Sequence, residues 1–170
     1  MGSLLKTDEI QHTSGSGTAV TLPKASMSGG TITSGVTFPA GMIINVTSTS
    51  ITRESSQFTS TSFTDIADDQ SNALSVSVTP KTNNKILLMA TLMVSGTDYN
   101  IYLRFMRGSS AIGVNTNPGS RPAATMSTYG SGSSKTYETM PTPMQFLDTT
   151  PGGDGSTSIV YKIQLRVQSS

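Results

Sequence analysis

The sequence lacks the residue types on which several kinds of chemistry depend. It has no cysteine and a single histidine, His12. Disulfides and thiolate metal sites are therefore excluded, and one histidine without cysteine is too little for a zinc site. A Ser-His-Asp triad would have to use His12, which stands among threonine, serine and glycine with no pocket of its own. We interpret His12 as a solvated residue, and we expect no enzyme, no cofactor and no bound metal.

Charge and long hydrophobic runs are scarce as well. Charged residues make up 12% of the chain, about half the share that is usual in globular domains. The net charge is +1 and both signs are scattered, so the basic stripe of a nucleic-acid-binding surface is missing. No apolar run reaches the ~18 residues of a membrane span. We therefore expect neither nucleic acid nor an inserted membrane segment.

A short pattern occurs twice near the amino end. VTLP at residues 20–23 returns as VTFP at residues 36–39, with serine and glycine around both copies. Each copy alternates apolar and hydroxyl residues, which is the period of a strand, and ends at a proline, which cannot donate to a ladder. Such strands are too short to bury a core alone. We predict that residues 1–41 form an extended β-rich arm that packs against identical neighbours and anchors the protein. The candidate anchor residues are Leu4, Leu5, Ile10, Val20, Leu22, Val36 and Phe38.

Residues 42–170 carry a series of strand signals that are separated by turns. This pattern, with no convincing helix, predicts an all-β head domain built as a jelly-roll-like β-sandwich, in which two packed sheets protect the strand edges. The immunoglobulin topology stays open as an alternative, although its Cys…Trp…Cys pattern is absent. The expected strands are 42–52, 58–66, 74–78, 86–94, 101–106, 111–114, 123–129, 135–139, 144–148 and 159–167.

Two of these strands indicate how the domain is packed. Residues 86–94 are apolar without alternation, which predicts a strand buried on both faces. One face would meet the core and the other a partner subunit; a buried helix is the competing interpretation. Residues 159–167 alternate, so we expect Ile159, Tyr161, Ile163, Leu165 and Val167 to point into the core.

The loops between strands supply the candidate contact residues. Loops on a rigid scaffold are a common place for recognition, and polar residues gather at 68–72, 115–122 and 130–134. A calcium site is one interpretation of the neighbouring residues Asp65, Asp68 and Asp69, but their spacing differs from that of an EF-hand. Asp148 and Asp154 flank a glycine-rich turn, where aspartate commonly caps backbone groups. The candidate receptor-contact residues are Asp68, Asp69, Asn72, Asn115, Asn117, Arg121, Tyr129 and Ser131.

Several segments in order along the chain resemble small bacteriophage tail-fibre proteins, especially those of aquatic phages. They are LKTDEIQ at 5–11, TLP at 21–23, GVTFPAG at 35–41, VTPKTNNKILL at 78–88, LRFMRG at 103–108, and the ending that opens with FLD at 146–148 and runs to 167. The resemblance covers most of the chain. It implies a protein on the virion surface, usually trimeric, with a β-structured arm and a jelly-roll head. The family offers no catalytic residues to transfer.

These observations together predict a non-enzymatic structural protein of a phage particle. We expect a homotrimer that contacts other virion proteins of the tail, baseplate or capsid, and a host-surface glycan or protein. Because residues 1–6 contain no stretch of signal-peptide length, we expect synthesis in the host cytoplasm and release within the particle. Three alternatives stay open: a capsid decoration trimer, a carbohydrate-binding module, and a glycan-cleaving enzyme.

Overall fold

A computed structural model describes residues 41–55, 57–95, 100–129 and 139–168. The chain divides into two units, Met1–Ile44 and Asn45–Ser170, whereas the sequence suggested a boundary at Gly41. The second unit holds all the strands described below. Some predicted features lie outside the described residues: the arm with Leu4, Leu5, Ile10, Val20, Leu22, Val36 and Phe38, then Ser131, and the strand expected at 135–139.

The described part of the chain is all-β, as the sequence predicts. No helix occurs in it, and every strand pairing is antiparallel. The helical alternative for residues 86–94 is therefore wrong, since these residues form a strand. The strands are β1 (Thr64–Asp65), β2 (Ser75–Val78), β3 (Ile86–Val94), β4 (Asn100–Arg107), β5 (Ser110–Ile112), β6 (Met126–Tyr129), β7 (Met140–Asp148) and β8 (Ile159–Val167).

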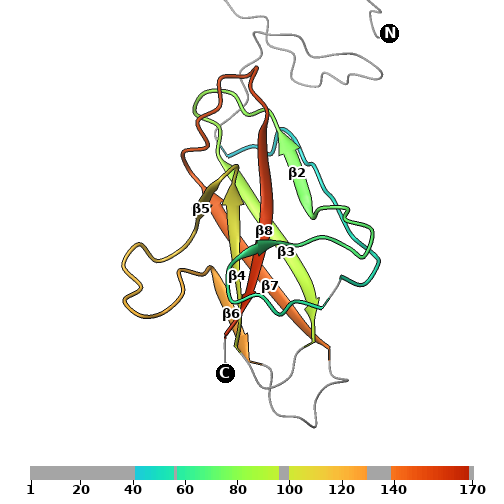
Figure 1. Ribbon diagram of the computed structural model, residues 1–170. Coiled ribbons are helices and arrows are strands. Elements are labelled where there is room, and N and C mark those ends of the chain that lie inside the picture. Colours follow the sequence, from blue (N-terminus) through green and yellow to red (C-terminus); the bar gives the residue numbers. More distant parts are fainter. Residues whose placement is uncertain (1–40, 56, 96–99, 130–138, 169–170) are drawn as a thin grey trace, which may run out of the picture. The chain divides into compact units, whose positions relative to one another are not determined.

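The larger sheet has six strands and is organised around β8 and β4. These two long strands pair over seven residues, from Ile101 opposite Val167 to Arg107 opposite Tyr161. The short strands β1 and β2 both pair with β8, and β5 and β6 both pair with β4. Figure 1 shows β8 between β4 and β2. The hairpin of β4 and β5, which turns at Gly108 with a φ of 57°, confirms the predicted turn at this place.

The smaller sheet consists of β3 and β7 alone, and the two strands pair over their full nine residues. Pro141 and Pro143 lie inside β7 opposite Met93 and Thr91. Proline is tolerated in a strand where its missing N–H would face a sheet edge, so we infer that both prolines point their backbone nitrogens away from β3. They thereby hinder the addition of a further strand to the free edge of β7.

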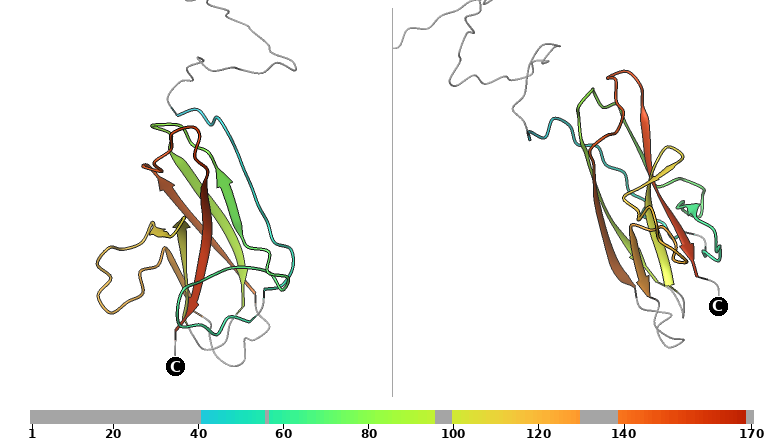
Figure 2. Two further views of the ribbon diagram at one scale, coloured as in Figure 1. Left: turned by 45° about the horizontal axis from the view of Figure 1, so that its top comes forward. Right: turned by 90° about the vertical axis from the view of Figure 1, so that its left-hand side faces the viewer.

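The core lies between the two sheets. The buried apolar side chains come from β4 (Ile101, Leu103, Phe105), β8 (Tyr161, Ile163, Leu165), β3 (Leu88, Val94) and β7 (Met144), together with Ile66. Leu103 is completely buried. In the right-hand view of Figure 2, β3 and β7 form one layer and face the strands of the larger sheet. The predicted alternation of β8 is confirmed, because its inward residues include three of these core side chains.

Two expected strands are largely missing from the structure, whereas others, such as 144–148 and 123–129, differ only in their bounds. Residues 42–52 join no ladder, and all but Ile51 are exposed. Of the strand expected at 58–66, only Thr64 and Asp65 pair, with Leu165 and Gln164. Both segments have the local sequence of a strand, but a strand forms only where a neighbouring edge accepts its hydrogen bonds. Local alternation therefore overestimates pairing in residues 42–66.

Candidate functional site

The outward face of the small sheet is apolar and uncharged. Leu87, Met89 and Met93 of β3 are 59%, 72% and 65% exposed, and Leu147 of β7 is 47% exposed. The remaining outward positions are Thr91, Pro141, Pro143 and Gln145. A hollow of about 390 Å³ lies at the middle of this face, beside Met89 and Pro143. We call these eight residues the apolar face.

This arrangement corrects one prediction about β3. The apolar run was expected to be buried on both faces, whereas within one chain only Leu88 and Val94 are fully buried and alternate residues are exposed. The sheet has a second layer on one side only. The expectation that a partner subunit covers the other side stays a prediction.

The outward face of the large sheet has the opposite character. Polar side chains on β1, β4 and β8 bind one another across the strands. Lys162 Nζ donates to Asp65 Oδ2 at 2.6 Å, and Gln164 Nε2 donates to Asp65 Oδ1 at 2.8 Å. Arg104 Nη2 donates to Gln164 Oε1 at 2.7 Å. Because this face holds charges and hydrogen-bonding groups, it suits contact with water or with a polar ligand. We call it the polar face.

Two aromatic rings lie among these charges on the polar face. The guanidinium of Arg104 lies 3.9 Å from the ring centre of Phe63. That of Arg166 lies 5.9 Å from Phe63 and 5.8 Å from Tyr102. Both arginines are half-buried, and burial lowers the pKa of Arg104. The sequence does not reveal this group, because its members come from three distant segments. Tyr102, Arg104 and Arg166 occupy outward positions of alternating strands, and Phe63 directly precedes β1.

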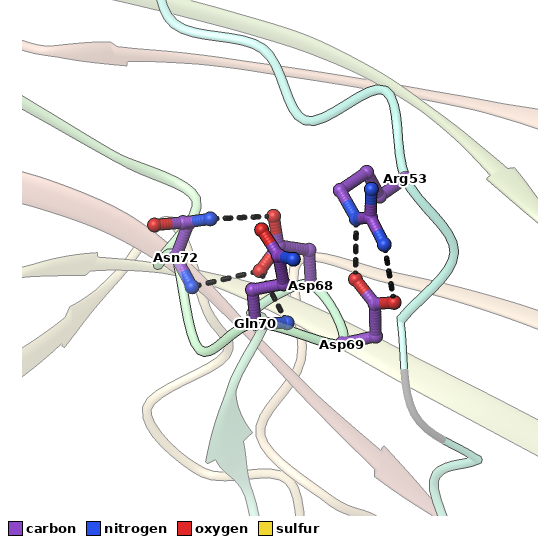
Figure 3. Close-up of polar contacts among 5 residues, drawn as sticks. All are labelled: Arg53, Asp68, Asp69, Gln70 and Asn72. Atoms are coloured by element: carbon purple, nitrogen blue, oxygen red, sulfur yellow. Dashed lines mark hydrogen bonds and ion pairs between the residues drawn. The ribbon is translucent and has the colours of Figure 1, made fainter.

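The loop at residues 68–72 is held by internal contacts. Asp68 is 7% exposed, and its carboxylate accepts hydrogen bonds from the backbone N–H groups of Gln70 and Asn72 at 2.9 and 2.8 Å and from Asn72 Nδ2 at 2.8 Å. These contacts lower the pKa of Asp68, the bond from the Asn72 side chain contributing most. Figure 3 shows this arrangement beside the ion pair of Arg53 with Asp69.

Asp68 is therefore poorly placed for the receptor contact that the sequence suggested. Its oxygens are occupied by its own loop, in the manner of aspartates that fold a turn. Asp69 and Asn72 are exposed, but Asp69 already holds Arg53 at 2.6 and 2.8 Å. In the described part of the chain, no group of three or more His, Cys, Asp or Glu side chains is arranged to hold a metal ion.

The second candidate loop lies open to solvent. Asn115, Asn117 and Arg121 are all exposed, and Asn115 Oδ1 accepts a hydrogen bond from the Asn117 backbone N–H at 2.9 Å. Tyr129 ends β6 and pairs with Asn100, so it belongs to a strand rather than to a loop tip. The structure leaves receptor contact by these residues a prediction.

A polar cluster joins the two sheets at one end. Asp148, at the end of β7, is 3% exposed. Its carboxylate accepts from Arg107 Nη1 of β4 at 3.0 Å and from Tyr161 Oη of β8 at 2.9 Å. It also accepts from the backbone N–H of Thr150 at 3.2 Å, which confirms the expected capping. Burial, and then the bond to Asp148, raises the pKa of Tyr161. Both carboxylate oxygens of Asp148 and the Tyr161 hydroxyl therefore have structural partners.

The turn after β7 is stabilised by its second aspartate, as the sequence predicted. Asp154 accepts from the backbone N–H groups of Thr157 and Ser156 at 2.7 and 2.8 Å, and from the Thr157 hydroxyl at 2.8 Å. These bonds hold the pKa of Asp154 far below its usual value. Asp154 thus has a structural role in this turn.

The sandwich is open along one side. A groove of about 1280 Å³ lies between the sheets and is lined by core side chains such as Leu92 and Val76 and by residues 47–54. Only Ile51 of that segment packs against the core. Arg53, Glu54 and Lys162 are the charged residues of the lining, so the groove is mainly an apolar interior that the described residues close incompletely.

The comparisons with known proteins identify no relative. No protein-family model, no curated protein and no solved structure matches the chain. None of the described residues forms a helix of the length and hydropathy that crossing a membrane requires.

Proposed function

We propose that the protein is a non-enzymatic structural component of a bacteriophage particle, of the tail-fibre type. In this proposal three chains associate through their head domains, residues 1–41 anchor them to the virion, and the heads present a surface to the host. The resemblance of segments along the sequence to small phage fibre proteins supports the viral part. The apolar face supports association, and it is the observation on which the proposal chiefly depends.

The contrast between the two sheet faces indicates how each head domain is oriented in the proposed trimer. The apolar face carries no charge, so burying it removes no ion from water. The polar face holds Lys162, Arg104 and Asp65, whose burial would be costly unless each stayed paired. We therefore place the apolar faces of the three copies towards the threefold axis and the polar faces outward. The jelly-roll description of the head belongs to the same proposal.

The size of the apolar face limits what it contributes. A nine-residue strand is about 30 Å long, and two strands are about 10 Å wide, so the face covers roughly 300 Å². A stable interface usually buries about 800 Å² per partner. Association through this face alone would be weak. The arms, and the partly open groove beside residues 47–54, would have to bury additional surface in the trimer.

The oligomeric mass of the full chain tests the assembly. Sedimentation equilibrium at several concentrations should give the mass of three chains for the wild type. Met89→Asp places a charge at the centre of the apolar face and should shift the equilibrium towards monomer. Val160→Asp is the matched control, because Val160 is a 40% exposed apolar residue on the outward side of β8. It should leave the mass unchanged. A monomeric wild type at every concentration would contradict the proposal.

A further inference from the structure

The polar face contains two arginines without an acidic partner. Two other arginines form ion pairs: Arg53 pairs with Asp69, and Arg107 pairs with Asp148. Lys162 pairs with Asp65. Among the residues that the structure describes, no carboxylate contacts Arg104 or Arg166. The two positive charges lie near the same ring, that of Phe63.

The register of the sheet explains why these side chains meet. Tyr102 of β4 lies opposite Arg166 of β8, and Arg104 lies opposite Gln164. Asp65 of β1 pairs with Gln164 on the edge of β8 that is opposite to β4. Phe63 stands two residues before Asp65, so its side chain faces the same surface of the sheet as that of Asp65. The group thus gathers side chains from β4, from β8 and from the residue that precedes β1, on one surface of the sheet.

The arginines keep donors that no group in the described chain uses. Arg104 donates from Nε and Nη2 to the single oxygen Gln164 Oε1, and a guanidinium has five N–H donors. The Nε atom of Arg166 is buried without a hydrogen-bond partner. Because this atom is buried, a ligand would meet the Nη groups at the outer end of Arg166 rather than Nε. The Arg104 guanidinium lies directly over the Phe63 ring, whereas that of Arg166 lies at the outer range of cation–π contact with Phe63 and Tyr102. Such contacts engage the face of a guanidinium and leave the N–H donors at its edge.

We infer that Arg104 and Arg166 form a binding site for the anionic groups of a polysaccharide. Arginine recognises carboxylate and phosphate through paired N–H donors, and the Arg104 guanidinium, which already lies over Phe63, loses little freedom when it binds. Gln168 and Asn100 at the end of the same face bond to each other and offer polar groups to sugar hydroxyls. That the polysaccharide belongs to the host surface rests on the proposed function; the anion site itself does not.

Binding of defined polymers to the full chain tests this site. Isothermal titration at low salt would use alginate, which carries carboxylates, a teichoic acid, which carries phosphates, and neutral dextran. The wild type should bind at least one of the two anionic polymers and should not bind dextran. Arg166→Gln and Arg104→Gln should each weaken that binding roughly tenfold, the scale of one charged hydrogen-bonding group. Preference for alginate or for teichoic acid identifies the anion.

Arg53→Gln is the matched control, since it removes the same charge from an arginine that pairs with Asp69 outside the polar face. It should bind like the wild type, and far-UV circular dichroism should show that all three variants stay folded. Absence of wild-type binding to both anionic polymers, or an equal loss in Arg53→Gln, overturns the inference. The sedimentation mass of the same samples tests the assembly separately, so a trimer that binds neither polymer refutes only the anion site.

Discussion

Replacing Asp148 by alanine should break the polar connection between the two sheets. The Asp148 side chain is 4% exposed and accepts hydrogen bonds from residues on β4 and β8 as well as from its own turn. Alanine leaves the Tyr161 hydroxyl buried without an acceptor. It also leaves Arg107 with only the backbone oxygen of Thr150, at 2.5 Å.

The expected loss follows from these contacts. Removing one partner of a buried ion pair costs about 3–5 kcal/mol, but Arg107 is 29% exposed, so water recovers part of its solvation. An unsatisfied buried hydroxyl costs about 1–3 kcal/mol. We therefore expect Asp148→Ala to lower the free energy of unfolding by about 3 kcal/mol. Urea denaturation followed by far-UV circular dichroism measures this, at one fixed protein concentration because association adds to apparent stability.

Two further variants make this prediction refutable. Asp148→Asn keeps one acceptor oxygen and should lose less than alanine does. Asp65→Ala removes a partly exposed acid that binds Lys162 and Gln164, and exposed pairs contribute only ~0–1 kcal/mol. If Asp148→Ala costs no more than Asp65→Ala, the cluster does not hold the sheets together and the reasoning is wrong.

Two other predictions concern pH and close packing. The pKa of Tyr161 is raised in the folded protein. The protonated hydroxyl therefore stabilises the fold fully below a pH of about 10, the pKa of tyrosine in the unfolded chain, and this contribution is lost as the pH rises above that value. Tyr161→Phe should therefore be less stable than the wild type at pH 7 by about 1 kcal/mol, and it should lose less stability than the wild type between pH 9 and 11. Urea titrations at each pH measure both. If the free energy of unfolding falls with pH as steeply in the variant as in the wild type, the prediction is wrong. At Gly153, a Cβ atom would lie 2.1 Å from the Pro80 carbonyl oxygen, whereas nothing lies within 4 Å of one at Gly152. Gly153→Ala should consequently lower the thermal midpoint more than Gly152→Ala, which meets only the strain of a φ of 79°; the reverse order would show that the loop moves aside easily.

The sequence was a good guide to the strands and turns of the head domain. The alternation in residues 159–167 correctly predicted which side chains of β8 face the core, because residue parity alone decides the side in a strand. The turn after β7 was equally predictable from its glycines and aspartates. Residues 42–52 were mispredicted because their alternation gave no information about whether a sheet edge was available to them.

The candidate site was less predictable. Asp68 was chosen as a loop residue available to a receptor, but the folded loop turns its carboxylate towards Gln70 and Asn72. Arg104 and Arg107 are three residues apart in β4 and therefore lie on opposite faces of one strand. The sequence could not show that Arg107 reaches Asp148 while Arg104 lies over Phe63, since each partner is distant in the sequence.

The amino-acid sequence by itself determined that this part of the chain would be all-β, where most of its long strands would run, and that disulfides and thiolate metal sites were excluded. Those properties depend on composition and on the period of neighbouring residues. Only the tertiary structure decided that β3 would cover the core with one face and expose the other, and that Arg104 and Arg166 would share a face with two aromatic rings. These outcomes depend on strand order and register, which are set by contacts between residues far apart in the chain.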